Sequence, residues 1–175
     1  MKKMFRIAMM AVMLFVCSSI NAQEGTSETY SFNKFATLPT GAWSIDQKLE
    51  GVEVVRRRAN LTLTFAQGDG KNAPEYITSS TNKGEDINVV SLLPGNTMTL
   101  TSEKNNITQI QFFYTTKGKS AYGKNYEMTE GAYPGEKAYT YIWTGKTQVF
   151  QLKNLNNKGG IEIYKIVVNY EPAEQ

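Results

Sequence analysis

The chain has 175 residues, with 19 basic and 16 acidic side chains, one cysteine and no histidine. Without histidine it lacks the commonest general base and the commonest metal ligand near neutral pH, which excludes Ser-His-Asp, Cys-His and histidine-zinc chemistry. We therefore predict no catalytic residue, metal ligand or cofactor. A calcium site assembled from oxygen ligands on separate strands stays open, because such a site leaves no local motif.

The first 22 residues have the pattern of a secretory signal peptide. A basic start precedes an unbroken apolar run over residues 7–16, and small and polar residues follow as far as Ala22. Ten apolar residues are too few to span a bilayer, which needs about 20. Cleavage after Ala22 predicts a secreted, periplasmic or cell-surface protein whose mature chain has no transmembrane segment. Lipoprotein anchoring through Cys17 is the alternative, although Val16 is a poor fit for the residue before a lipidated cysteine.

Removing 22 of the 175 residues leaves 153, which is enough for one domain with a sizeable core. The removed segment holds three of the 19 basic residues and no acidic one, so 16 of each sign remain and the formal net charge is 0. This balance gives no electrostatic reason to expect nucleic acid as a partner. Because Cys17 leaves with the signal, the mature chain is predicted to have no disulfide.

The rest of the chain alternates apolar and polar residues, as in Leu-Thr-Leu-Thr-Phe at 61–65, and this period of two is typical of strands. Turns rich in Gly, Asn and Pro separate the alternating segments. The pattern predicts strands over 29–33, 43–49, 52–56, 60–67, 75–78, 87–92, 97–102, 107–115, 139–144, 147–152 and 160–170. The predicted fold is all-β, a single antiparallel β-sandwich of jelly-roll type over 29–170. Residues 23–28 are expected to be a linker and 171–175 a tail.

The last predicted strand changes phase along its length. Ile161 and Ile163 share one face, whereas Ile166, Val168 and Tyr170 have the opposite parity. Either both faces are covered, or a β-bulge near Tyr164–Lys165 shifts the phase, and we favour the bulge.

Residues 117–137 form the longest stretch without a clean pattern and are expected to be a loop. The stretch carries Tyr122, Tyr126 and Tyr133 among glycines and charged residues. Long loops often hold binding residues, and tyrosine joins an apolar face to a polar hydroxyl, so these tyrosines are candidate ligand contacts. The two tryptophans, Trp43 and Trp143, are expected in the core.

The one dense basic run is Arg56-Arg57-Arg58. On a strand, Arg56 and Arg58 would point the same way, and arginine binds carboxylate, sulfate or phosphate through two parallel hydrogen bonds. Arg56 and Arg58 are therefore candidate ligand-binding residues. The alternative is a solvated strand end that keeps a sheet edge soluble.

A set of motifs in a fixed order resembles a recurrent secreted β-sandwich module of anaerobic Gram-negative bacteria. The motifs are LTLTF at 61–65, GDGKNAPEY at 68–76, PGNTMTL at 94–100, ITQIQF at 107–112, WTG at 143–145, VF at 149–150 and IEIYKIVVNY at 161–170. The resemblance implies a jelly-roll-like sandwich, similar in outline to carbohydrate-binding modules and cell-surface adhesion domains. It carries over no catalytic or binding residue.

These observations predict an exported, non-catalytic binding domain for carbohydrate or another cell-surface ligand. One alternative is a structural or adhesive surface protein that pairs with other proteins through a strand edge. Another is a small carboxylate-dependent glycoside hydrolase, which would need two carboxyl groups flanking a cleft.

Overall fold

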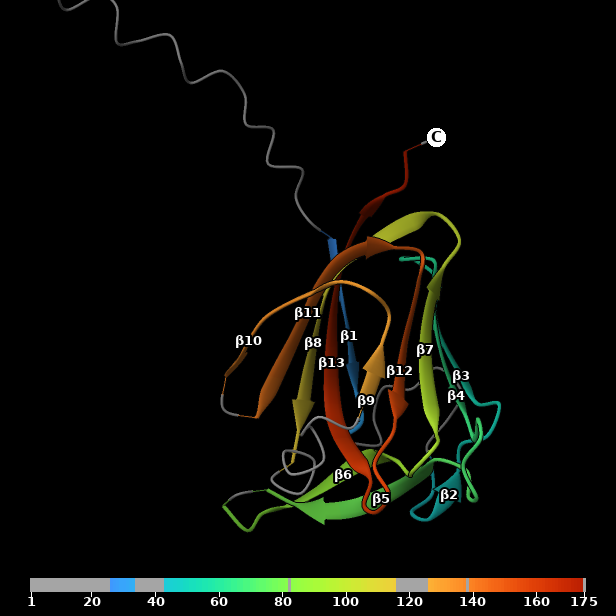
Figure 1. The fold of residues 1–175 in the computed structure, drawn as a ribbon, viewed down its shortest axis with the longest axis vertical. Helices are drawn as coiled ribbons and strands as arrows, with labels where there is room; N and C mark the ends of the chain where they lie inside the picture. Colours follow the sequence, from blue (N-terminus) through green and yellow to red (C-terminus); the bar gives the residue numbers. More distant parts are fainter. Residues whose placement is uncertain (1–25, 34–42, 82, 116–125, 138, 175) are drawn as a thin grey trace, which may run out of the picture.

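The computed structural model describes residues 26–33, 43–81, 83–115, 126–137 and 139–174. These residues form two antiparallel sheets that pack face to face, so the predicted all-β sandwich is confirmed (Figure 1). The segment assigned to the export signal lies outside the described residues, and secretion stays a prediction. No described segment forms a helix long and apolar enough to cross a membrane.

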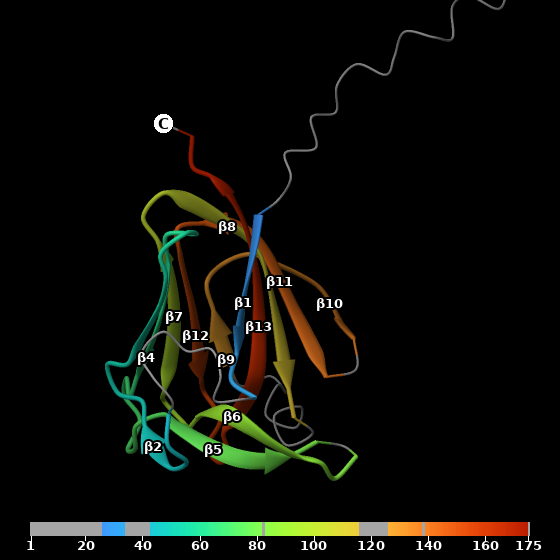
Figure 2. The same cartoon turned by 180° about the vertical axis from the view of Figure 1, so that it is seen from behind.

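The larger sheet, called sheet A here, has eight strands. Its order is β10 (Ala132–Lys137), β11 (Thr140–Thr147), β8 (Asn105–Tyr114), β13 (Ile161–Pro172), β6 (Asp86–Leu92), β5 (Glu75–Ser80) and β2 (Gln47–Lys48), with β1 (Thr26–Ser31) paired to β13. Sheet B has five strands, in the order β3 (Glu53–Arg56), β4 (Leu61–Ala66), β7 (Thr97–Ser102), β12 (Val149–Asn154) and β9 (Tyr126–Met128). Figure 2 shows β5 and β6 crossing the lower end of the sandwich.

Strand β13 pairs with β8 on one side, and with both β6 and β1 on the other. Its pairing with β8 shifts where Ile163 faces Tyr114 but Lys165 faces Phe113, so Tyr164 is an extra residue. The predicted bulge is therefore confirmed. It allows the apolar residues on both sides of the shift to be buried, although their parities differ.

Aromatic rings fill the space between the sheets. Trp143 is fully buried and packs edge-on against Phe150, with ring centroids 4.9 Å apart. Trp43 is also buried and contacts the rings of Phe32, Phe65 and Tyr76 at centroid distances of 5.4–6.0 Å. The predicted core positions of both tryptophans are confirmed.

The expected loop over 117–137 is wrong in its second half, because β9 and β10 lie there. Strand β9 has three residues, too few for an alternation to be visible. Strand β10 contains Pro134 and Gly135, and its register with β11 shifts between Ala132 and Gly135, which obscures the period of two.

Several boundaries also differ from expectation. The strand expected over 43–49 is reduced to β2, because residues 45 and 46 form a turn in which Asp46 has a φ of 64°. Strand β1 begins at Thr26, within the segment expected to be a linker, and β13 continues to Pro172, within the segment expected to be a tail.

Two fully buried tyrosines give a matched test of the core. The Tyr76 hydroxyl donates to the carbonyl of Phe32 at 2.7 Å, whereas the Tyr30 hydroxyl has no hydrogen-bond partner among the described residues. A buried polar group without a partner costs about 1–3 kcal/mol, and a satisfied one contributes about 1 kcal/mol. We therefore expect Tyr30→Phe to raise the free energy of unfolding and Tyr76→Phe to lower it, as measured by urea denaturation. Equal losses in the two variants would contradict this account of Tyr30.

Candidate functional site

Three connections between the sheets meet at one end of the sandwich. They join β4 to β5, β6 to β7, and β12 to β13. Because β4, β7 and β12 are neighbours in sheet B, and β5, β6 and β13 are neighbours in sheet A, the three connections must lie side by side. They are the Gly-, Asn- and Pro-rich turns at 67–74, 93–96 and 155–160.

The first two turns are tied together by Asn96, whose side chain is fully buried. Its amide oxygen accepts a hydrogen bond from the backbone N–H of Leu93 at 2.7 Å. Its amide nitrogen donates to the carbonyls of Gln67 at 3.0 Å and Asn72 at 2.7 Å. One side chain therefore satisfies three backbone groups from two turns.

Asn154, which is also fully buried, holds the third turn through hydrogen bonds of its side chain. Its amide nitrogen donates to the carbonyls of Leu92 at 2.7 Å and Gly159 at 3.2 Å. Its amide oxygen accepts from both the backbone and the side-chain nitrogen of Asn156, at 2.9 and 2.7 Å. In addition, the N–H of Gly95 donates to the carbonyl of Asn154 at 2.8 Å.

The turns approach so closely that glycine is needed at the contact. A Cβ on Gly70 would lie 2.5 Å from the carbonyl oxygen of Pro94, and a Cβ on Gly95 would overlap the backbone of Gly70. Gly95 also has a φ of 84°, in the left-handed region that favours glycine. The geometry of this junction is thus fixed by backbone contact as well as by the two asparagines.

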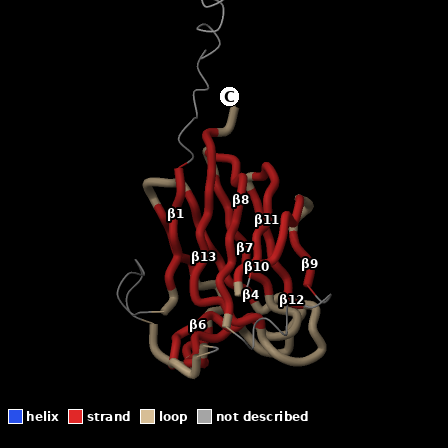
Figure 3. Tube along the Cα trace, turned by 90° about the vertical axis from the view of Figure 1, so that its left-hand side faces the viewer, coloured by secondary structure: helices blue, strands red, loops and turns tan. Residues whose placement is uncertain are grey.

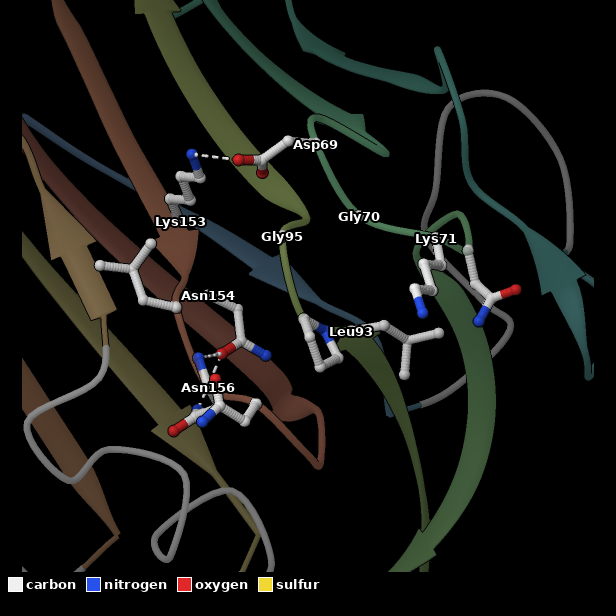
Figure 4. A pocket seen from close by; sticks show the side chains of 12 residues that line it. Asp69, Gly70, Lys71, Leu93, Gly95, Lys153, Asn154 and Asn156 are labelled. Carbon is white, nitrogen blue, oxygen red and sulfur yellow. Dashed lines mark hydrogen bonds and ion pairs between the residues drawn. The ribbon is translucent and has the colours of Figure 1, made fainter.

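An open pocket of about 490 Å³ lies over this junction (Figure 4). This volume is within the range of about 300–1,000 Å³ that is usual for small-molecule sites. The pocket is lined by Asp69, Gly70, Lys71, Asn72, Leu93, Pro94, Gly95, Lys153, Asn154, Leu155, Asn156 and Asn157. Its lining therefore combines amides, two lysines and one carboxylate with apolar surface, including Leu155, which is 45% exposed.

An ion pair borders the pocket. The ammonium of Lys153 lies 3.1 Å from the carboxylate of Asp69, and Figure 4 shows Lys71 on the far side of the pocket. The hydrogen bond from Lys153 holds the pKa of the Asp69 carboxyl below its ordinary value. Because Asp69 is exposed, the pair orients two charged groups at the rim more than it stabilises the fold.

The predicted tyrosine contacts are not among the described pocket residues. Tyr126 lies in β9 of sheet B and packs edge-on against Tyr141, with hydroxyls in hydrogen-bond contact. Tyr133 lies in β10 of sheet A, and its side chain is outside the described part of the structure, as is the whole of Tyr122. The described residues therefore place Tyr126 against the core and leave the tyrosine site a prediction.

The predicted arginines separate between a strand and a turn. Arg56 ends β3, and its guanidinium lies 5.0 Å from the ring centroid of Tyr30. The same group donates a hydrogen bond to the carbonyl of Thr29 on β1 at 3.3 Å. This bond links β3 of sheet B to β1 of sheet A. Arg58 is exposed in the turn that follows β3. Neither arginine lines the pocket described here.

A buried carboxylate, Glu162, lies at the start of β13. It accepts hydrogen bonds from the hydroxyls of Ser79 at 2.5 Å and Thr115 at 2.6 Å. It therefore links β13 to β5 and to the end of β8. Glu162 does not border the pocket, and the described residues contain no group of three or more acidic or cysteine side chains that could hold a metal ion.

A signal for the pocket was present in the sequence, because each of the three turns is rich in glycine and asparagine. The missing information was that β4, β7 and β12 are neighbours, which depends on pairing between distant segments. No known family model matches the chain, and no curated protein matches it either, so the family similarity stays a resemblance.

The buried amide of Asn96 can be tested by Asn96→Ala. This change removes three hydrogen bonds and leaves two carbonyls and one N–H without their partner, so we expect a loss of about 2–4 kcal/mol in the free energy of unfolding. Asn157→Ala, which truncates an exposed amide in the same pocket, is the control and should change stability by less than about 0.5 kcal/mol. Urea denaturation measures both variants, and a similar small effect in both would contradict the structural role of Asn96.

The ion pair predicts a titration shift. In the folded protein Asp69 should titrate below its ordinary value of 3.8, and in Lys153→Met it should return toward that value. Because the folded pKa is lowered, the favourable pairing is complete above 3.8 and is lost as the pH falls through the folded value. Carboxyl-carbon NMR shifts of Asp69 measure this directly, and an unchanged midpoint in Lys153→Met would exclude the pair in solution.

Proposed function

We propose that the chain is an exported, non-catalytic domain that binds carbohydrate, with the pocket at the three-turn junction as its contact site. The observation that carries the proposal is the fixed array of hydrogen-bonding groups around an open pocket of suitable size. A sugar presents many hydroxyls, each able to donate and to accept. Amides are suited to such groups because they offer donors and acceptors on one planar side chain.

The remaining pocket residues complement this chemistry. Leu155 and Pro94 offer apolar surface to the C–H groups of a sugar ring, while Asp69 and Lys153 offer a charged acceptor and a charged donor at the rim. The ligand contacts would come from side chains whose backbone is held by Asn96 and Asn154, so little ordering would be required on binding.

The pocket favours binding over hydrolysis. Paired-carboxylate hydrolysis needs two carboxyl groups about 5–10 Å apart across a cleft. The described lining holds one carboxylate, Asp69, and this group is paired with Lys153.

The strand-edge alternative receives less support from the geometry. Among the described strands, β1 is paired with β13 alone and could accept another strand along its other edge. The guanidinium of Arg56 already donates to a carbonyl of β1, that of Thr29, and so occupies part of this edge. Size-exclusion chromatography distinguishes the two functions, because assembly through β1 would give concentration-dependent oligomers.

Binding can be tested by titrating the protein with glucose, galactose, mannose, N-acetylglucosamine and their disaccharides while recording NMR spectra of the side-chain amides. We expect at least one sugar to shift the signals of Asn156 and Asn157 in a saturable manner. Asp69→Ala and Asn157→Ala should each weaken the affinity about tenfold, since each removes one hydrogen-bonding side chain from the pocket.

Gln151→Ala is the matched control, because it removes an exposed amide from the same strand as Lys153 but outside the pocket. It should leave the affinity unchanged. The proposal is overturned if no sugar shifts the pocket amides, or if all three variants behave alike.

A further inference from the structure

The outer face of sheet A carries a regular grid of side chains over β11, β8, β13 and β1, which lie side by side in Figure 3. Cross-strand partners point to the same face of a sheet, so the register fixes which residues share this surface. The three rows across the four strands are Thr140–Phe113–Lys165–Ser31, Ile142–Gln111–Val167–Thr29 and Thr144–Gln109–Asn169–Ser27. Most of these side chains are half-exposed, and none of them belongs to the core.

Three amides on β8 and β13, the two middle strands of the grid, are held in a fixed arrangement. The side-chain oxygen of Gln109 accepts hydrogen bonds from the side-chain nitrogens of Gln111 and Asn169, both at 3.0 Å. This network uses one oxygen and two nitrogens. It leaves the amide nitrogen of Gln109 and the amide oxygens of Gln111 and Asn169 without a described protein partner, and therefore able to bond a ligand.

An aromatic pair lies at one end of the grid. The rings of Phe113 and Tyr164 are 6.1 Å apart at an angle of 55°, and the ammonium of Lys165 lies 3.9 Å from the Phe113 centroid. Tyr164 is the extra residue at the bulge of β13, so the bulge brings a half-buried ring to the border of the amide network. The face thus combines oriented amides with aromatic and aliphatic surface.

Charge and area identify the occupant. Of the twelve residues in the grid only Lys165 is charged, so the surface lacks the cationic density that nucleic acid or a polyanion requires. With strands about 4.8 Å apart and same-face residues about 6.8 Å apart, the grid spans about 14 by 14 Å, on the order of 200 Å². A stable protein interface buries about 800 Å² on each partner. The area therefore fits a short segment of a polymer chain and is too small for a protein dimer.

We propose that this outer face of sheet A is a second binding surface, one that takes a neutral polysaccharide chain through the Gln109–Gln111–Asn169 amides. The inference rests on the proposed carbohydrate function but involves different residues from the pocket. The pocket would bind a terminal or single sugar unit, and the flat face would bind an extended stretch of chain. Two sites on one domain would raise the apparent affinity for a polymer above that for its units.

Affinity gel electrophoresis with laminarin, mannan, xyloglucan and inulin tests the proposal, with polygalacturonate and heparin as anionic comparisons. We expect at least one neutral polymer to retard the protein, and Gln111→Ala and Asn169→Ala each to weaken this retardation about tenfold. Gln151→Ala is the matched control, because it removes an exposed strand glutamine from sheet B. Urea denaturation establishes that each variant is folded.

The outcomes separate the two sites. If Asp69→Ala and Asn157→Ala abolish polymer binding while Gln111→Ala and Asn169→Ala leave it intact, the second surface is refuted and the pocket function stands. If the grid variants weaken polymer binding while no small sugar shifts the pocket amides, the pocket function fails and the second surface stands. Stronger retardation by polygalacturonate or heparin than by any neutral polymer, or retardation by no polymer at all, overturns the inference.

Discussion

The arrangement of sheet A depends on strand β13 serving three partners at once. Its first residues pair with β6, its later residues pair with β1, and β8 follows it along the other side. A strand of constant phase could not do this and still bury Ile163 and Ile166, because these residues differ in parity. The extra residue at Tyr164 resolves the conflict at the point where the partner changes from β6 to β1. The same shift turns Lys165, Val167 and Asn169 outward and so determines the composition of the outer face.

At one end of the sandwich, the buried amides of Asn96 and Asn154 link separate turns, as a disulfide or a metal ion does in many small domains. Asn96 and Asn154 satisfy carbonyl and N–H groups in turns that belong to different parts of the sequence. Such a junction is specific in shape, because each bond has a preferred direction and length. The junction is also sensitive to substitution, because a buried amide destabilises the fold if any of its hydrogen-bond partners is missing. The shape of the pocket depends on this junction, because residues of the three linked turns line it.

The sequence predicted most of the strands and the core, because alternation and aromatic content are local signals. Leu61 to Phe65 and Thr97 to Ser102 show their pattern without reference to other segments, and the structure places them in β4 and β7. The bulge in β13 could also be predicted, because the apolar residues change from odd to even positions between Ile163 and Ile166. Strands β9 and β10 were missed, since one is very short and the other contains Pro134 and Gly135.

The candidate site was less accessible to prediction than the fold. Its turns were recognisable one at a time, but their proximity follows from the neighbouring positions of β4, β7 and β12, which are far apart in the chain. The long tyrosine-bearing segment was predicted to bind a ligand because loops often carry binding residues. The structure describes the side chain of one of its three tyrosines, Tyr126, which packs against Tyr141, and the tyrosine site stays a prediction. The structural role of Asn96 and Asn154 could not be predicted from the sequence, because asparagine is common in turns for local reasons.

The pairing of β1 with β13 has a consequence for the order in which the chain can fold. Thr26 faces Tyr170, so the first described strand and the last are neighbours in one sheet. Until β13 has been synthesised, β1, β6 and β8 all lack the strand that joins them, and sheet A cannot be completed. Contacts of such long sequence separation are associated with slow folding. A nascent chain of this protein therefore cannot form its full sandwich until β13 has been synthesised, and until then the strands of sheet A that flank β13 have unpaired edges.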